Sequence, residues 1–83
     1  MFKIFFTKDS QKQYDKLPKT VQPRIAKALA TLSWDPFKGK KLGGELAGLY
    51  TMRAWPYRII YTVDQIQQEV IVTSIQHRQG AYK

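Results

Sequence analysis

The sequence predicts one α+β domain over residues 1–83, with two N-terminal helices packed on one face of a small antiparallel sheet of about four strands. Three observations lead to this fold class. A chain of 83 residues holds only one small core. Up to about residue 34 the apolar residues recur at helical spacing, and from Leu49 onward they recur at every second position. We expect the second face of the sheet to stay open.

The first two elements are a strand and a polar helix. Residues 2–6 are apolar enough for a strand, and residues 8–17 predict the helix. Thr7 is a suitable N-cap, because its hydroxyl can accept a hydrogen bond from a first-turn amide. Asp9 would then lie in the first turn, where a negative charge is favourable.

A second helix is expected from Thr20 to about Trp34. Thr20 is a suitable N-cap, and Pro23 is tolerated because first-turn amides have no acceptor within the helix. The apolar residues that follow helical spacing predict a buried face formed by Val21, Ile25, Ala28, Leu29 and Leu32. We expect Trp34 to cover the core next to this face.

The remainder of the chain predicts a loop and an antiparallel meander. Residues 35–48 hold four glycines and three lysines and are expected to be mostly loop. Strands are expected near 48–54, 57–63 and 69–75, joined by tight connections. The side chains of the middle strand expected to face the helices are Tyr57, Ile59, Tyr61 and Val63.

The composition is strongly basic. Fourteen Lys and Arg against six Asp and Glu give a net charge of +8 and a pI near 9.9. Such a surface indicates a polyanionic partner, either nucleic acid or an acidic protein. The alternative is a basic surface that only keeps the chain in solution.

Several classes of site and location are excluded or disfavoured. The chain has no cysteine, so disulfides and thiolate metal sites cannot form, and the single histidine argues against a transition-metal site. We expect no metal and no other cofactor. The first apolar run, Ile4–Phe6, is too short for a signal peptide or a membrane span. A cytoplasmic protein without a membrane partner is therefore expected.

Two arginines stand in the strand-like stretch "YTMRAWPYRIIY", residues 50–61. A two- or four-residue connection centred on Trp55–Pro56 would place Arg53 and Arg58 directly opposite each other, whereas an odd loop length would not. Two like charges facing across strands normally destabilise a sheet, unless an anion lies between them. The alternative is that both side chains splay into solvent while their stems cover apolar surface.

The C-terminal residues favour the anion. Arg78 follows the last strand next to His77, and Tyr82 lies four residues further on. One guanidinium group can bind two phosphate oxygens at once. A tyrosine ring can stack on a base of single-stranded RNA. The residues alone therefore predict a phosphate or RNA site, although a His-Arg pair is often only surface decoration.

Three stretches in this order resemble the RelE/ParE superfamily of type II toxins, on the RelE-like side. "FTKDSQKQYDKLP" resembles the opening strand and first helix of that family. "VQPRIAKALATLSWDPFKGKKLGGELAGLYTMRAWPYRIIY" resembles its second helix, loop and hairpin, and "IQHRQGAY" resembles its closing segment. The resemblance covers nearly the whole chain.

The resemblance implies a metal-independent endoribonuclease that cuts messenger RNA in the ribosomal A site. A 2′-hydroxyl would attack the adjacent phosphodiester while basic side chains stabilise the phosphorane. By position, Arg53 would lie near the scissile phosphate and Arg58 would stabilise the transition state. Arg78 would assist the leaving group, and Tyr82 would orient or stack on the substrate.

This sequence departs from the family pattern at Thr51, where a lysine is common as a candidate base. Arginine cannot replace such a lysine, since it stays protonated. His77 is then the expected proton-transfer group, with Lys40 and Lys41 of the loop in reserve. The alternative for His77 is a hydrogen-bonded residue at the strand end without chemistry. Lys40, Lys41, Thr51 and Trp55 are the expected RNA-binding residues.

The resemblance also implies partners and leaves two rival functions. A small acidic antitoxin would hold the toxin in check, and operator DNA would be contacted mainly through the antitoxin. The first rival is a ParE-like toxin that poisons DNA gyrase without being an enzyme, because that fold is shared. The second is a degenerate member that only binds RNA or an antitoxin, which the departure at Thr51 keeps open.

Overall fold

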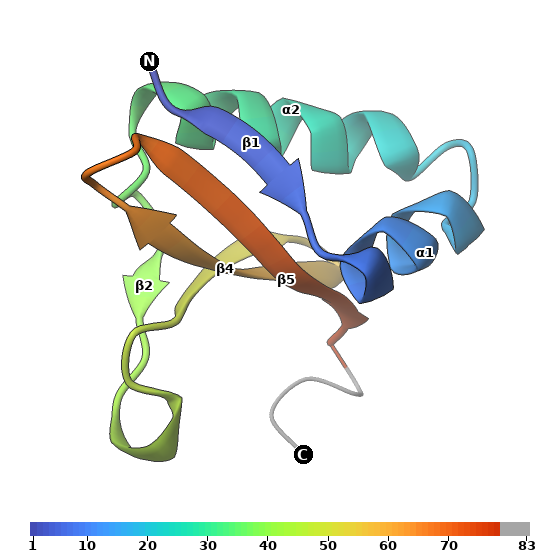
Figure 1. Ribbon diagram of the computed structural model, residues 1–83. Helices are drawn as coiled ribbons and strands as arrows, with labels where there is room; N and C mark the ends of the chain where they lie inside the picture. Colours follow the sequence, from blue (N-terminus) through green and yellow to red (C-terminus); the bar gives the residue numbers. More distant parts are fainter. Residues whose placement is uncertain (79–83) are drawn as a thin grey trace.

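Five strands form one mixed sheet, and two helices pack on the same side of it (Figure 1). The computed structural model describes residues 1–78. The strands are β1 (Lys3–Phe6), β2 (Lys40–Lys41), β3 (Tyr50–Ala54), β4 (Tyr57–Asp64) and β5 (Glu69–His77). The helices are α1 (Lys8–Lys16) and α2 (Gln22–Trp34), with a short 3-10 helix, η1, at Gly44–Leu46. Within residues 1–78, no helix is both long and apolar enough to cross a membrane.

The sheet has the order β1-β5-β4-β3-β2. The antiparallel meander of β3, β4 and β5 is confirmed, as is the α+β class. The expected count of about four strands, all antiparallel, needs correction. β1 pairs in parallel with β5, which the long connection between them permits, and β2 adds a fifth strand of only two residues. So short a strand carries no periodic signal in the sequence.

The first predicted helix cap is confirmed and the second is wrong. Thr7 Oγ1 accepts the Ser10 amide hydrogen bond at 3.1 Å. The helix α2 instead begins after Val21, which makes no side-chain cap bond. The Pro18 carbonyl accepts the amides of Val21 and Gln22 at 2.8 and 3.1 Å, so the turn between the helices does the work expected of a Thr20 hydroxyl.

The core lies between α2 and the centre of the sheet. Its buried residues are Ile25, Ala28, Leu29, Leu32, Ile59, Tyr61, Val70, Val72 and Ile75. The inward direction predicted for Ile59 and Tyr61 is confirmed, and Tyr57 and Val63 pack against the same cluster. Trp34, in contrast, is 73% exposed, so the expectation that it covers the core is wrong. It stands two residues after Leu32, which turns it roughly 200° around the helix from that buried side chain.

A β-bulge interrupts the pairing of β4 with β5. The register shifts between Ile60, which lies opposite Ser74, and Tyr61, which lies opposite Val72, so Thr73 is the extra residue. The Thr73 hydroxyl donates to the Ile60 carbonyl at 3.1 Å. Because of the extra residue, Val72 and Ile75 face the same core although they are three positions apart.

Candidate nucleic-acid interface

The arginine pair forms as predicted. Trp55 and Pro56 alone connect β3 to β4, through a cis peptide bond, and Arg53 lies directly opposite Arg58. The side chain of Arg53 is exposed and that of Arg58 is half-buried. Residues that face each other across an antiparallel pair share a side of the sheet, so both arginines lie on the same face.

A hollow of about 300 Å³ lies beside this pair. Its described lining consists of Lys38, Gly39, Lys40, Thr51, Met52, Arg53 and Arg58. Four of these residues are cationic, and no Asp or Glu is among the described lining residues. We call this feature the basic hollow; its charge and its guanidinium groups suit a phosphate group.

The pairing of β2 decides which loop lysines reach the basic hollow. Lys40 lies opposite Thr51, and Lys41 lies opposite Tyr50, so the two lysines alternate between the faces of the sheet. Lys40 lines the basic hollow together with Lys38, whereas Lys41 is not among its described lining residues. Sequence reasoning missed Lys38. The alternation of positions 38 and 40 could have found it, had the two-residue strand been visible.

The Tyr61 hydroxyl anchors the loop that carries these lysines. It donates to the Pro36 carbonyl at 2.9 Å and accepts the Gly39 amide hydrogen bond at 3.1 Å. Burial raises the pKa of this hydroxyl above 10.0, although the hydrogen bond from Gly39 acts in the opposite direction. A Cβ atom at Gly39 would collide with the Tyr61 hydroxyl and lie 2.6 Å from the Thr51 carbonyl oxygen. Glycine thus lets the loop lie close to β3 and β4.

Thr51 forms part of the basic hollow and carries an unusual hydroxyl. The residue is 8% exposed, and its Oγ1 atom has no hydrogen-bond partner within the described part of the chain. A buried hydroxyl in this condition costs free energy, so such groups are rare in native proteins. The hydroxyl oxygen has less than 1 Å² of accessible surface, so a ligand would reach it only after a shift of the neighbouring side chains.

The hairpin tip gathers further arginines. The Cζ atoms of Arg53 and Arg78 lie 6.0 and 5.0 Å from the centre of the Trp55 ring. The backbone amide of Arg78 donates to the Pro56 carbonyl at 2.8 Å, and Arg24 Nη1 donates to the Trp55 carbonyl at 3.5 Å. The tip therefore brings Arg78, after the end of β5, to the same tryptophan ring that Arg53 of the arginine pair approaches.

His77 lies on the other face of the sheet. It is opposite Tyr57 in the register, and the two rings meet edge to face with centroids 5.3 Å apart. The residue opposite Arg58 is Gln76. Without the bulge at Thr73, Arg58 would face Ile75, and His77 would share the arginine face. His77 is not among the described residues that line the basic hollow, and Tyr82 lies outside the described residues.

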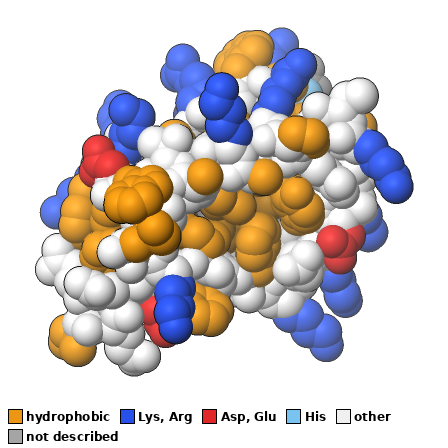
Figure 2. Space-filling model, turned by 90° about the horizontal axis from the view of Figure 1, so that it is seen from above, with side chains coloured by type: hydrophobic (Ala, Val, Ile, Leu, Met, Phe, Trp, Pro, Cys, Tyr) orange, Lys and Arg blue, Asp and Glu red, His pale blue; other side chains and the backbone are white. Residues whose placement is uncertain are grey.

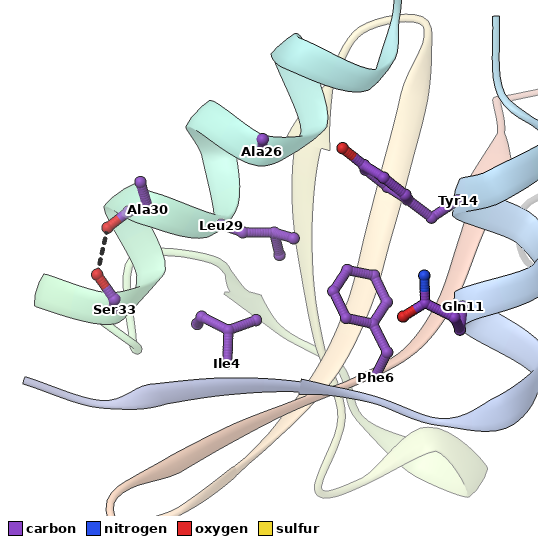
Figure 3. Close-up of a pocket in the computed structure, with 8 residues that line it drawn as sticks. All are labelled: Ile4, Phe6, Gln11, Tyr14, Ala26, Leu29, Ala30 and Ser33. Atoms are coloured by element: carbon purple, nitrogen blue, oxygen red, sulfur yellow. Dashed lines mark hydrogen bonds between the residues drawn. The ribbon is translucent and has the colours of Figure 1, made fainter. Parts of the chain in front are cut away.

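A second hollow of about 390 Å³ lies between β1, α1 and α2. Its lining is mostly apolar and consists of Ile4, Phe6, Gln11, Tyr14, Ala26, Leu29, Ala30 and Ser33 (Figure 3). Figure 2, seen from the side of α2, shows hydrophobic side chains in a hollow across the middle of this face and Lys and Arg side chains around it. We call this feature the apolar hollow.

Known proteins share the sequence pattern and the fold of this chain. Residues 4–82 match the family model described as ParE toxin of the type II toxin–antitoxin system parDE. The chain belongs to the RelE/ParE superfamily of type II toxins. This toxin is 30% identical to Toxin RelG of Mycobacterium tuberculosis over 84 residues, which cover 99% of this chain and 97% of the relative.

Two solved structures match the toxin along nearly its whole length. A chain of the RelBE2 toxin–antitoxin complex from M. tuberculosis has a TM-score of 0.86 at 30% identity, covering 93% of the toxin and 98% of that chain. A chain of the archaeal RelE–RelB complex from Pyrococcus horikoshii has a TM-score of 0.78 at 26% identity, covering 96% and 98%. The fold expected from the resemblance is confirmed.

Proposed function

We propose that this toxin is a ribosome-dependent, metal-independent endoribonuclease that cuts messenger RNA in the A site. The observation that supports the proposal is the basic hollow, where Lys38, Lys40, Arg53 and Arg58 converge without a carboxylate among the described lining residues. A hollow of this charge attracts a polyanion and can bind a phosphodiester between two guanidinium groups. A gyrase poison would have no need for such a site.

The reaction follows from RNA chemistry. The 2′-oxygen attacks the adjacent phosphorus, the bond from phosphorus to the 5′-oxygen breaks, and the products are a 2′,3′-cyclic phosphate and a 5′-hydroxyl. The phosphorane carries more negative charge than the bound phosphodiester. Arg53 and Arg58 therefore stabilise the transition state more strongly than the ground state, which is what accelerates the step. Arg78, placed at the hairpin tip, would donate to the departing oxygen.

The proton of the 2′-hydroxyl has to pass to a base. The position of His77 against Tyr57, on the face opposite Arg58, disfavours it for this role. Lys38 and Lys40 line the basic hollow and are therefore the better-placed candidates. Proton transfer by His77 stays a prediction, and comparing a His77→Asn variant with a Lys40→Met variant tests it.

The toxin would be inhibited by a cognate antitoxin that is small and acidic. Structures of relatives have been solved in complex with antitoxins. In one of them, a RelE toxin is bound to a peptide of its antitoxin. An acidic segment suits the net charge of +8, and an apolar side chain or two would fill the apolar hollow. Operator DNA would be contacted through the antitoxin.

The test combines purified toxin with ribosomes stalled on a defined message, and primer extension maps new 5′ ends. We expect cuts confined to the A-site codon, lost in the Arg58→Ala and Arg78→Ala variants. Unchanged cutting in both variants would show that the site is wrongly assigned.

The rival function is gyrase poisoning, which the ParE name of the family model favours. It predicts an intact message together with inhibited DNA supercoiling in a gyrase assay. An intact message, no effect on gyrase and retained binding to RNA or antitoxin would instead support a degenerate member.

A further inference from the structure

The hairpin tip holds an aromatic ring that lies outside the buried core cluster. Trp55 is 53% exposed and occupies the first position of a two-residue turn. An exposed indole there adds little to the core, and a small polar residue would suit a tight turn better. The ring lies close to two guanidinium groups, those of Arg53 and Arg78.

Two arginines from different parts of the chain approach this one ring. Arg53 comes from the end of β3, and Arg78 is the first residue after β5. Their Cζ atoms lie 6.0 and 5.0 Å from the ring centre, within the range of cation–π attraction. Indole has the strongest such attraction among the aromatic side chains, so it can offset part of the repulsion between the two guanidinium groups.

The backbone supports the same arrangement. The Arg78 amide donates to Pro56, and Arg24 of α2 donates to the carbonyl of Trp55 itself. The tip is thus connected both to the end of β5 and to a helix. The side chains of Arg53 and Arg78 are exposed and would rotate freely without the contact to the Trp55 ring. Ordering such long side chains costs entropy, which the contact has to offset.

We propose that Trp55 is a positioning residue, whose indole ring holds Arg53 and Arg78 at one end of the basic hollow before RNA arrives. The inference rests on the proposed nuclease function, because stabilising the charged transition state requires that both guanidinium groups are correctly oriented. Preorganised cations lower a reaction barrier more than mobile ones, since they need no rearrangement as charge develops. Loss of the ring should therefore lower kcat more than it raises KM.

The chain offers a clean way to change the ring without changing its shape. It has two tryptophans, and replacing the exposed Trp34 by Phe leaves Trp55 as the only indole. Incorporation of mono-, di- or tetrafluorotryptophan then withdraws electron density from the Trp55 ring in steps. A residue with a purely structural role would not respond to these steps, whereas cation–π attraction weakens with each of them.

The first measurement uses the uninhibited toxin without RNA. The ¹⁹F resonance of monofluorotryptophan at position 55 should shift in the Arg78→Gln and Arg53→Gln variants and stay in place in a Lys3→Gln control on the far strand β1. An unmoved resonance in both arginine variants would overturn the proposal. This readout is independent of cleavage, so a failure of the ring–arginine contacts can be told apart from a failure of the proposed nuclease function.

The second measurement is cleavage of ribosome-bound message. We expect kcat to fall stepwise by about fivefold in total across the fluorinated series, and Trp55→Phe to retain more activity than Trp55→Leu. A flat series would overturn the proposal. So would tighter RNA binding on fluorination without a change in kcat, which would assign the ring to stacking on a base.

Discussion

The basic hollow and the apolar hollow have similar volumes, about 300 and 390 Å³, but their walls differ entirely. The apolar hollow lies against the helices and has no charged side chain in its described lining, whereas the basic hollow has four cations. The size of a hollow therefore says little about its ligand. The chemistry of the walls differs more: the apolar hollow suits an apolar segment of a protein, and the basic hollow suits a phosphate group.

The origin of the two hollows also differs. Small side chains at Ala26 and Ala30 leave a gap between α2 and β1 that the core residues do not fill (Figure 3). The basic hollow instead exists because Tyr61 and Gly39 hold a lysine-bearing loop against β3. The first depends on missing volume and the second on two specific hydrogen bonds, so different substitutions should affect them.

The largest effect is expected for Arg58→Ala. Removing one preorganised donor from a developing oxyanion costs roughly 10²- to 10³-fold in kcat in other enzymes. Single-turnover cleavage of ribosome-bound message should therefore fall by about that factor, while binding of the antitoxin through the apolar hollow should persist. A loss of both properties would mean that the two surfaces are not separate, and thermal unfolding of the variant provides the check on folding.

The next effect concerns the apolar hollow. Ala26→Lys places a charged side chain where we propose that an apolar antitoxin segment packs, and burying that charge is costly. We expect the dissociation constant of the antitoxin to rise by about a hundredfold, measured by calorimetry. Thr20→Lys, in the turn between the helices, adds the same charge outside the hollow and serves as the control. Equal effects of the two variants would show that only net charge matters.

The matched lysines of β2 give a smaller effect. Lys40 lines the basic hollow and its neighbour Lys41 alternates to the other face. We expect Lys40→Met to lower kcat/KM for message cleavage by about tenfold and Lys41→Met by less than about threefold. Equal losses would mean that both lysines act only through long-range attraction. In that case both losses should shrink as the salt concentration rises, because salt screens long-range attraction.

Much of this architecture could be predicted from the sequence because it depends on local rules. Alternation along the strands and a two-residue turn are enough to place Arg53 opposite Arg58. The position of His77 could not be predicted this way, since the bulge at Thr73 reverses the face of every later residue in β5. No residue pattern marks that bulge, and a shift by one position is invisible to a periodicity argument.

The lysine loop shows a second limit. Lys38 reaches the basic hollow through contacts between Gly39, Pro36 and Tyr61 that span more than twenty positions. The sequence predicts that Tyr61 points inward from its strand. Only the fold shows that its hydroxyl forms hydrogen bonds with the loop. Likewise, Thr20 has a side chain suited to an N-cap, but the Pro18 carbonyl accepts the hydrogen bonds of the Val21 and Gln22 amides instead.

The smallest effect, and the one that tests this anchor, is expected for Tyr61→Phe. The substitution leaves the buried Pro36 carbonyl and the Gly39 amide without their partner, which should lower the free energy of unfolding by about 1–3 kcal/mol in denaturant titrations. Cleavage should fall modestly, because Lys38 and Lys40 lose their fixed positions. Tyr14→Phe is the control, because the Tyr14 hydroxyl donates a long hydrogen bond of 3.4 Å to the Gln22 carbonyl.

The Tyr61 hydroxyl also makes stability depend on pH. Burial raises its pKa in the folded state above the ordinary value of 10.0, so the folded protein holds this proton more tightly than the unfolded chain does. Below about pH 10 the hydroxyl is protonated in both states, so its stabilising contribution is fully present there and does not change with pH. As pH rises from about 10 through the folded pKa, the unfolded chain releases the proton first, and the free energy of unfolding falls. The difference between wild type and Tyr61→Phe should therefore shrink above about pH 10. A difference that stays constant to higher pH would mean that the hydroxyl ionises equally in both states, and that the loop is not anchored by a buried, protonated tyrosine.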